Sequence, residues 1–375
     1  MEKKMLEVVE LTRQHCRSTL IALGVAALLA ACATPAPTTA PDSSSSTVTK
    51  AAAPLPAAPA PVPVVTSAEE TALRQLVDLQ DRLDRVAGPL LVNNPALCKR
   101  NARRLLGFTA KTKYSYSTEF TPAAQKLLQL DERLRVTGVL PGSGADKVGV
   151  LRGDILLSVN EKSLPQGPNA ERQTAALLAP MVTSRGNVKL TVLRNNRQMV
   201  FDVPLTMACA FRVELGNTDA VNAYSDGYRV LVTRGMLAYA KSDQDLAYVL
   251  AREMAHNALN HPVRLRSSAT IAGVIDNLIR VNPDLGMING TAGIKPYSQS
   301  IDAAADVMAL FMTARAGVDI DGASAFWERL ANQYPIATTN GYTALHPATT
   351  YRLAAIDKAT ADIHAKQAMQ KPLIP

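Results

Sequence analysis

The chain has 375 residues, more than one domain usually needs, so we expect two domains with appended segments. Hydrophobic residues make up 47% and charged residues 19%, which excludes a wholly disordered chain. The net charge is +8, but no long basic run occurs and aromatic residues make up only 5%, so we expect no nucleic-acid partner and at most a weak attraction to anionic membranes.

The N-terminal segment has the pattern of an export signal. Behind two arginines, an uncharged apolar stretch covers residues 19–31, which is shorter than the ~20 residues of a membrane-spanning helix. It ends in Leu-Ala-Ala-Cys at Cys32, which resembles the lipobox of bacterial lipoproteins; the alternative is an ordinary signal peptide with an unrelated cysteine. The resemblance implies a signal peptide over residues 1–31 and a lipid on Cys32 that anchors the protein to a membrane. Because Ala33 is not acidic, it also implies the outer membrane of a bacterial envelope, facing the periplasm.

Residues 32–66 are expected to form a disordered tether behind this anchor. They consist mainly of Pro, Ala, Ser and Thr, with almost no large apolar side chain to bury. In an extended polyproline conformation, at about 3.1 Å per residue, such a segment reaches roughly 100 Å. The globular part is therefore expected to begin near Ser67.

The cysteines outside the leader and anchor are Cys98 and Cys209. An exported protein meets an oxidising compartment, where two cysteines permit one disulfide. We predict a Cys98–Cys209 bridge; two buried free thiols are the alternative.

The first folded part is predicted to be a helical segment over residues 67–104, capped by Ser67, followed by a strand-rich module. The order of features in that module resembles the PDZ signature of bacterial envelope proteases and covers roughly residues 105–205. Its features are a strand over 134–140, a Pro-Gly-Ser turn, a short helix, Gly153-Asp154 entering a strand, a helix over 169–179 and a hairpin over 188–203.

A PDZ module adds an extended peptide to a sheet edge and holds its terminal carboxylate in backbone N–H groups. The resemblance therefore implies a polypeptide or protein C-terminus as partner. Residues 105–108, Leu-Leu-Gly-Phe, have the composition of the carboxylate loop, but a helix C-cap followed by a buried Phe explains them equally well.

The second part carries an incomplete metal-binding motif. A helix is expected to begin at Ser242 and to contain Arg252-Glu253-Met254-Ala255-His256. In the zincin motif H-E-x-x-H, two histidines on one helical face bind zinc and the glutamate activates water. With its flanking segments, this stretch resembles the HtpX-like zinc metallopeptidases, the CAAX-prenyl-protease group of gluzincins, over roughly residues 210–358. We expect a metallopeptidase-like domain over residues 206–365 and a tail over 366–375.

The resemblance assigns a role to each matching position. Arg252 stands where the first zinc-binding histidine should be. The remaining assignments are Glu253 as general base, His256 as second zinc ligand, Asp302 in place of the third-ligand glutamate, Asp306 as the acidic residue one helical turn on, and His346 in a His-Pro loop near the metal.

The exchange at position 252 has a direct physical consequence. Arginine offers a metal no lone pair and adds a permanent positive charge. Asp302 is one methylene shorter than glutamate, which draws its carboxylate back from a zinc position. We predict that the Arg252 guanidinium fills the zinc cavity and pairs with Asp302 or Asp306. Zinc held by His256, Asp302 and His346 with Arg252 turned aside is one alternative, and a purely structural role of Glu253 and His256 is another.

Together these patterns predict an α+β protein, with a PDZ-like β-sandwich or barrel module followed by a mainly helical zincin-like domain. The predicted function is binding of extended polypeptides, at the PDZ groove and at a strand over residues 228–233, with an impaired or inactive protease site. The alternative is an active zinc-dependent endopeptidase that acts on envelope proteins through Glu253, with zinc on His256, Asp302 and His346.

Overall fold

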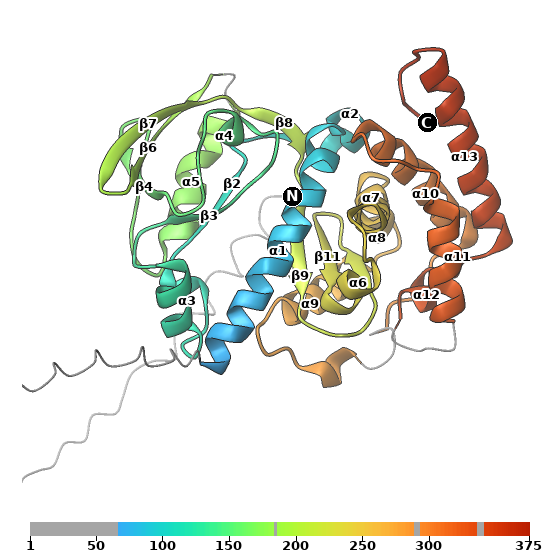
Figure 1. Cartoon of the computed structure of the whole chain (residues 1–375), viewed down its shortest axis with the longest axis horizontal. Helices are drawn as coiled ribbons and strands as arrows, with labels where there is room; N and C mark the ends of the chain where they lie inside the picture. The colour runs from blue at the N-terminus through green and yellow to red at the C-terminus, as the bar shows by residue number, and fades with distance from the viewer. Residues whose placement is uncertain (1–66, 184–185, 289–292, 336–340) are drawn as a thin grey trace, which may run out of the picture. The chain divides into compact units, whose positions relative to one another are not determined.

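The computed structural model describes residues 67–183, 186–288, 293–335 and 341–375, which combine helices and sheets (Figure 1). The predicted signal peptide, Cys32 and tether lie outside the described residues. No helix among the described residues is both long and apolar enough to cross a membrane.

In chain order the elements are α1 (Ala68–Val92), α2 (Pro95–Cys98), the 3-10 helix η1 (Lys99–Asn101), β1 (Ala102–Leu105), β2 (Phe108–Lys111), η2 (Lys113–Ser115), α3 (Thr121–Leu128), β3 (Arg135–Val139), α4 (Gly144–Lys147), β4 (Ile155–Val159), β5 (Lys162–Ser163), α5 (Ala170–Thr183), β6 (Val188–Arg194), β7 (Arg197–Val203), β8 (Thr206–Cys209), β9 (Arg212–Gly216), β10 (Ala223–Ser225), β11 (Arg229–Thr233), α6 (Arg234–Tyr239), α7 (Asp243–Ala258), α8 (His261–Arg264), α9 (Ser268–Leu278), η3 (Leu285–Ile288), α10 (Gln299–Arg315), α11 (Ala323–Gln333), α12 (Tyr342–Leu345) and α13 (Thr350–Ala368).

Helix α1 begins as its sequence predicts and contacts two of the sheets directly or beside a strand. The Ser67 side chain accepts a hydrogen bond from the Glu70 N–H, which satisfies one of the free donors at the helix start. Further along, Asp81 pairs with Arg152 beside β4, while Gln80 bonds the backbone of β9. The helix therefore lies between the two parts that the sequence distinguishes.

The first sheet has six strands in the order β2-β3-β4-β6-β7, with β5 paired to β4. Every pairing in it is antiparallel. The β6–β7 hairpin turns at Asn195 and Asn196, whose positive φ angles of 50° and 58° suit a tight hairpin turn. The sheet is open, with β2 at one edge, so the expected sandwich or barrel is not confirmed: no sheet among the described residues closes on itself.

A disulfide joins the segments that precede and follow this six-stranded sheet. Cys98 at the end of α2 is bonded to Cys209 in β8, with their Cα atoms 5.6 Å apart. Next to it, β1 and β8 form a two-stranded antiparallel sheet. The chain thus enters and leaves the six-stranded sheet at one covalently closed point.

The second sheet has three strands in the order β10-β11-β9. The expectation that a polypeptide adds to the strand over residues 228–233 is wrong, because β11 is the central strand and both of its edges are paired. The outer edge of β9 is also engaged, since the Gln80 side chain bonds both the Val213 carbonyl and the Leu215 N–H. The outer edge of β10 has no strand partner, but all three residues of β10 are buried, so it is not open to an added strand either.

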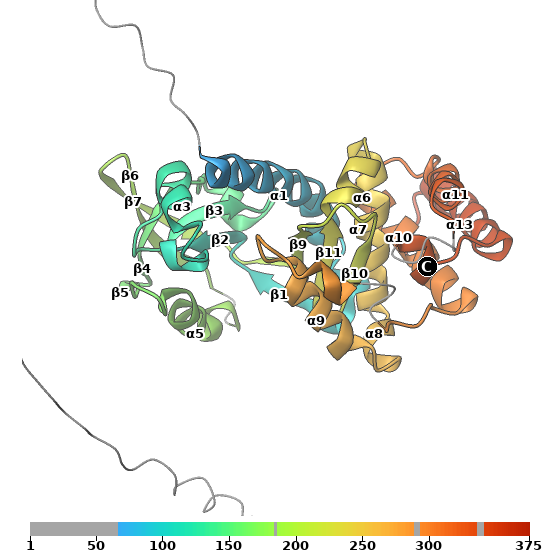
Figure 2. The same ribbon diagram turned by 90° about the horizontal axis from the view of Figure 1, so that it is seen from below.

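Helices follow this sheet and surround a shared core. Helix α7, capped by Ser242, packs side by side with α10, which is capped by Ser298 (Figure 2). Helix α13 packs on α10, and α11 packs on α13 and α7. Residues of these helices, including Phe326 and Trp327, join one hydrophobic core with α1 and the three-stranded sheet. This packing fixes the faces of α7 and α10 that carry the predicted site residues.

Candidate functional site

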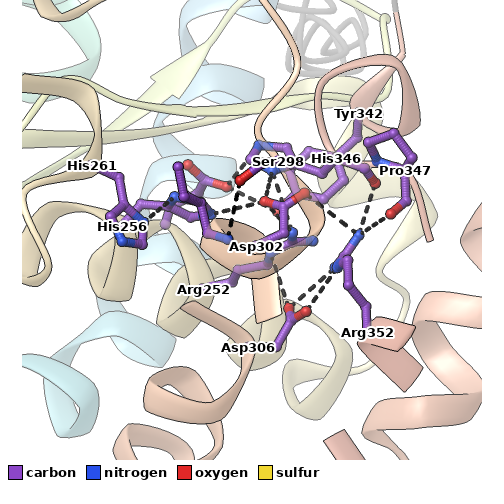
Figure 3. Close-up of polar contacts among 12 residues, drawn as sticks. Arg252, His256, His261, Ser298, Asp302, Asp306, Tyr342, His346, Pro347 and Arg352 are labelled. Carbon is purple, nitrogen blue, oxygen red and sulfur yellow. Dashed lines mark hydrogen bonds and ion pairs between the residues drawn. The ribbon is translucent and has the colours of Figure 1, made fainter. Parts of the chain in front are cut away.

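The predicted site residues come together between α7, α10 and the turn after α12 (Figure 3). Arg252, Glu253 and His256 lie on α7, and each is at most 1% exposed. Asp302 occupies the first turn of α10, where a carboxylate suits the positive end of the helix dipole. His346 follows α12 and is 3% exposed. The site is therefore fully enclosed.

The Arg252 guanidinium lies among carboxylates and aromatic rings. Its Nη2 is 2.9 Å from Asp302 Oδ1, and its Nε is 3.1 Å from Asp306 Oδ1. The rings of Trp327 and Tyr342 lie 4.9 Å and 5.4 Å from its Cζ, within range of a cation–π contact. Burial alone would lower the pKa of Arg252, but the neighbouring negative charges, led by Asp306, outweigh it and raise the pKa. The side chain is a permanent buried cation.

Asp302 is the centre of the polar contacts. Its Oδ1 accepts from His346 Nδ1 at 2.8 Å and lies 3.4 Å from His256 Nε2, besides its ion pair with Arg252. Burial by itself would raise the pKa of Asp302, but the Arg252 charge and the histidine contacts lower it well below the usual range. The carboxylate is ionised, and its Oδ2 is buried without a hydrogen-bond partner.

A second buried arginine, Arg352, holds the other carboxylate. Its Nε and Nη2 bond the two oxygens of Asp306 at 2.8 Å and 3.1 Å. Its Nη1 donates to the carbonyls of His346 and Pro347 at 3.0 Å and 2.6 Å. Arg352 thereby fixes the His-Pro turn against α10. The sequence shows that Arg352 follows the His-Pro turn, but no sequence pattern indicates that it pairs with Asp306.

Glu253 is held by two hydroxyl groups. Ser225 in β10 donates to its Oε2 at 2.7 Å, and Tyr342 donates to its Oε1 at 2.8 Å. Burial raises the pKa of Tyr342 well above its ordinary value, so this phenol stays protonated. Both carboxylate oxygens are therefore occupied by protein donors. Sequence reasoning missed Ser225 and Tyr342, because neither belongs to a motif of fixed spacing.

The histidines of the site are buried and in mutual contact. His256 Nδ1 lies 3.1 Å from His261 Nδ1, a distance at which one ring must donate and the other accept. Burial lowers the pKa of His261 to about 3 and that of His346 to about 4, and it also lowers the pKa of His256. The Tyr297 ring packs against His256 and His346, with centroids 4.4 Å and 5.0 Å away. These rings are neutral at ordinary pH.

Three of these residues could in principle hold a zinc ion. Ligand atoms of His256, Asp302 and His346 lie within 4.8 Å of one another, and His256 Nε2 is buried without a hydrogen-bond partner. However, zinc needs each ligand atom at about 2.0–2.2 Å. Asp302 Oδ1 is already engaged in an ion pair with Arg252 and in a hydrogen bond with His346 Nδ1. With Arg252 in this position, the residues do not fit zinc.

The predicted carboxylate loop lies between two strands. Leu105 ends β1 and Phe108 begins β2, so a helix C-cap does not explain this stretch. Ala145 donates to the Leu106 carbonyl at 3.1 Å, and Leu140 donates to the Gly107 carbonyl at 2.8 Å. The loop is thereby anchored at the start of the edge strand β2.

Comparison with known proteins places the peptidase resemblance in the second part of the chain. Residues 200–360 match Peptidase family M48. A beta-barrel assembly-enhancing protease of Vibrio cholerae is 29% identical over 187 residues, covering 41% of this chain and 38% of the relative. The mitochondrial metalloendopeptidase OMA1 of Schizosaccharomyces pombe is 24% identical over 147 residues, covering 38% and 44%. The chain thus spans less than half the length of these curated relatives. These matches confirm the resemblance to HtpX-like zinc metallopeptidases.

Solved structures match part of this chain at low overall similarity. The PDZ domain of HtrA3, bound to a phage-derived ligand, is 22% identical and covers 28% of this chain and 88% of that chain, with a TM-score of 0.20. The HtrA-type protease AlgW with a decapeptide is also 22% identical and covers 28% and 30%, with a TM-score of 0.21.

Proposed function

We propose, from the M48 resemblance of residues 200–360, that this chain is a peptidase-related envelope protein that binds extended polypeptides without hydrolysing them. The proposed organisation is a signal peptide over residues 1–31, a lipid on Cys32, a tether to residue 66, a PDZ-like module over 105–205 and a zincin-like domain over 206–365. The Leu-Ala-Ala-Cys pattern supports the anchor.

The observation that carries the loss of hydrolysis is the Arg252–Asp302 ion pair. Its two atoms lie 2.9 Å apart, and both side chains are buried. A guanidinium can replace a divalent cation in neutralising the carboxylates, but it can neither bind nor polarise water as zinc does. Because Glu253 already accepts from Ser225 and Tyr342, its carboxylate is also engaged by the protein.

A free strand edge supports polypeptide binding. The edge of β2 begins at the Leu106–Gly107 loop, which offers backbone N–H groups at one end of a strand. An extended chain can add to this edge through main-chain hydrogen bonds.

A second candidate function, zinc-dependent endopeptidase, rests on different atoms. The cluster of His256, Asp302 and His346 retains two buried atoms without a hydrogen-bond partner, His256 Nε2 and Asp302 Oδ2. Such atoms are costly to bury, and an ion would satisfy them. This function requires Arg252 to leave the position that it has in the structure.

Elemental analysis of the purified full chain separates the two functions. We expect less than stoichiometric zinc, and no chelator-sensitive cleavage of an unfolded, reduced and alkylated substrate protein. Stoichiometric zinc, with cleavage that Glu253→Gln abolishes, would establish the endopeptidase instead. Binding is measured separately by fluorescence anisotropy with an apolar decapeptide that has a free C-terminal carboxylate, and its C-terminal amide is the matched control. Equal affinity of the two peptides would exclude carboxylate capture at Gly107.

A further inference from the structure

Three chain segments that contain no acidic residue meet at one surface. Residues 85–118, 203–213 and 254–275 lack both Asp and Glu. The Asn101 side chain of the first segment donates to the Gly227 carbonyl at 3.1 Å, and the Arg212 N–H of the second donates to the Tyr228 carbonyl at 3.2 Å. Val263 of the third packs against Gly227, because a Cβ added there would lie 3.1 Å from Val263 Cγ2.

At this meeting point, apolar side chains protrude next to arginines. Tyr228 is 70% exposed, the highest value among the exposed large hydrophobic residues, while Leu265 is 46% and Val263 40% exposed. Residues 263–266, Val-Arg-Leu-Arg, form the end of α8 and the tight turn after it, in which Arg266 has a φ of 56°. We call Tyr228 and residues 263–266 the Tyr228 patch. Its apolar and basic side chains alternate on one short turn.

The positive charge of this patch is not neutralised within the protein. No carboxylate of the described residues forms an ion pair with Arg264 or Arg266. The neighbouring acids are already engaged, because Asp226 and Asp276 both bind Arg229, at 2.8 Å and 2.6 Å. An approaching partner therefore meets exposed apolar groups with two free guanidinium groups between them.

We propose that the Tyr228 patch docks on the surface of a membrane that contains anionic phospholipids. Aromatic and aliphatic tips are stable at the boundary of headgroups and acyl chains, where arginines beside them bind phosphate groups. The charge complementarity favours this occupant, and the sequence independently places a lipid anchor at Cys32. The anchor and the patch would hold the protein at the same membrane through two separate contacts.

Docking in this way has a consequence for the site. Helix α8 begins at His261, whose ring contacts His256. The patch and the site are therefore at opposite ends of one short helix, and docking brings the site close to the membrane surface. The inference itself does not depend on whether the site binds metal.

An environment-sensitive fluorophore tests the docking directly. The full chain carrying Cys16→Ser, Cys32→Ser and Leu265→Cys is labelled with a nitrobenzoxadiazole group and mixed with vesicles. Cys98 and Cys209 do not react because they are bonded to each other. We expect a several-fold rise in emission with vesicles of phosphatidylglycerol and phosphatidylcholine, and none with phosphatidylcholine alone. A label at Val200→Cys, which is also exposed (58%) but lies on β7, is the control and should not respond.

Charge variants then test the arginines. Arg264→Gln with Arg266→Gln should lower the docking constant by about 30-fold, the equivalent of about 1 kcal/mol for each arginine. Arg172→Gln with Arg197→Gln removes the same charge from exposed positions elsewhere and should change it less than 2-fold. Thermal melts of both pairs check folding.

Three results would overturn the proposal. The first is an unchanged emission at position 265 in anionic vesicles. The second is an equal loss of docking in the two charge pairs, which would indicate an unspecific charge effect. The third is a response to soluble polyglutamate with neutral vesicles but none to anionic vesicles, which would assign the patch to an acidic protein instead.

Discussion

The guanidinium of Arg252 lies 2.9 Å from the carboxylate of Asp302, and both side chains are buried. Two neighbouring residues explain why the pair is stable there. Trp327 and Tyr342 lie within 5.4 Å of the guanidinium carbon, which places the cation among aromatic rings, and Asp306 supplies a second negative charge. The side-chain cation of Arg252 thus neutralises these carboxylates, as a bound metal ion does in zinc peptidases.

Removing this cation should strongly destabilise the protein. In Arg252→Ala, Asp302 loses its ion pair and remains buried among neutral histidines, so we expect the free energy of unfolding to fall by about 3–5 kcal/mol. Urea denaturation at neutral pH measures this loss. The matched control is Arg329→Ala, which breaks the exposed pair with Asp245 and should cost less than about 1 kcal/mol. Equal losses in the two variants would contradict a buried ion pair as the source of stability.

Asp84 on α1 should make the stability depend on pH in the opposite sense from most carboxylates. Burial raises its pKa to about 6, against about 3.9 in the unfolded chain, although Gln80 donates to it at 2.8 Å. The folded state therefore binds the Asp84 proton more tightly, so the contribution of Asp84 to stability is fully present below pH ~4 and is lost as the pH rises through about 6.

Substitution of this carboxylate by its neutral isostere tests the sign. Asp84→Asn should raise the free energy of unfolding at pH ~8 by about 2 kcal/mol and leave it nearly unchanged at pH ~4. Urea midpoints at the two pH values give the difference. Asp81→Asn, which loses its pair with Arg152, is the control and should not stabilise the protein at either pH. A variant of Asp84 that is less stable at pH ~8 would exclude a charge penalty at this position.

Gly107 should tolerate no side chain. It has a φ of 93°, and a Cβ at this position would overlap the side chain of Ser143, which itself donates to the Gly107 carbonyl. Gly107→Ala should therefore distort the loop before β2, lowering peptide affinity by at least about 10-fold. Gly149→Ala is a suitable control, because this glycine also has a positive φ but no atom within 4 Å of an added Cβ. Peptide binding by fluorescence anisotropy should decline much more in the first variant.

The disulfide should contribute to stability through the long loop that it closes. Cys98 and Cys209 are 111 residues apart, and closing such a loop in the unfolded chain is worth about 2–5 kcal/mol. The double variant Cys98→Ser with Cys209→Ser should unfold at lower urea concentration, and a reducing agent should produce the same shift in the wild type but no further shift in the variant. Identical midpoints for oxidised and reduced wild-type protein would show that the bridge adds no stability.

Features with fixed local spacing could be predicted from the sequence. Ser67 and Ser242 start helices because a side-chain oxygen accepts a backbone N–H three residues later, a relation visible in the sequence itself. The positions of Glu253 and His256 on one helix follow in the same way from their separation along the chain. Such features need no knowledge of the tertiary structure.

Long-range partners could not be predicted in this way. Ser225 reaches Glu253 from another strand, and the pairing of Asp306 with Arg352 joins residues that are 46 positions apart. The central place of β11 likewise depends on which strands pair, and this depends on the whole sheet rather than on the β11 sequence. A strand that is buried on both faces, as β11 is, has a near-continuous apolar sequence whether it lies at the centre or at the edge of a sheet.

Restoring histidine at position 252 is the sharpest test of the site. In the structure, two arginines, Arg252 and Arg352, face the three carboxylates of Glu253, Asp302 and Asp306, and the nearby histidines are neutral. Arg252→His removes one positive charge and supplies a nitrogen lone pair that can bind zinc. In this variant one arginine, Arg352, faces three carboxylates, which leaves two negative charges without a partner. One divalent zinc ion would neutralise them. We therefore expect the variant to bind zinc with at least about 100-fold higher affinity than the wild type, as measured by competition with a fluorescent chelator.

A matched variant distinguishes the effect of the new imidazole ligand on zinc affinity from the effect of removing a positive charge. Arg252→Gln loses the same charge but supplies no nitrogen ligand comparable to imidazole, so its zinc affinity should stay well below that of Arg252→His. Zinc should also raise the melting temperature of the histidine variant, because a ligand that binds only the folded state stabilises it. Equal zinc affinity in the two variants would mean that charge alone controls the cavity. No gain in either would mean that the short Asp302 side chain, rather than the arginine, keeps the metal out.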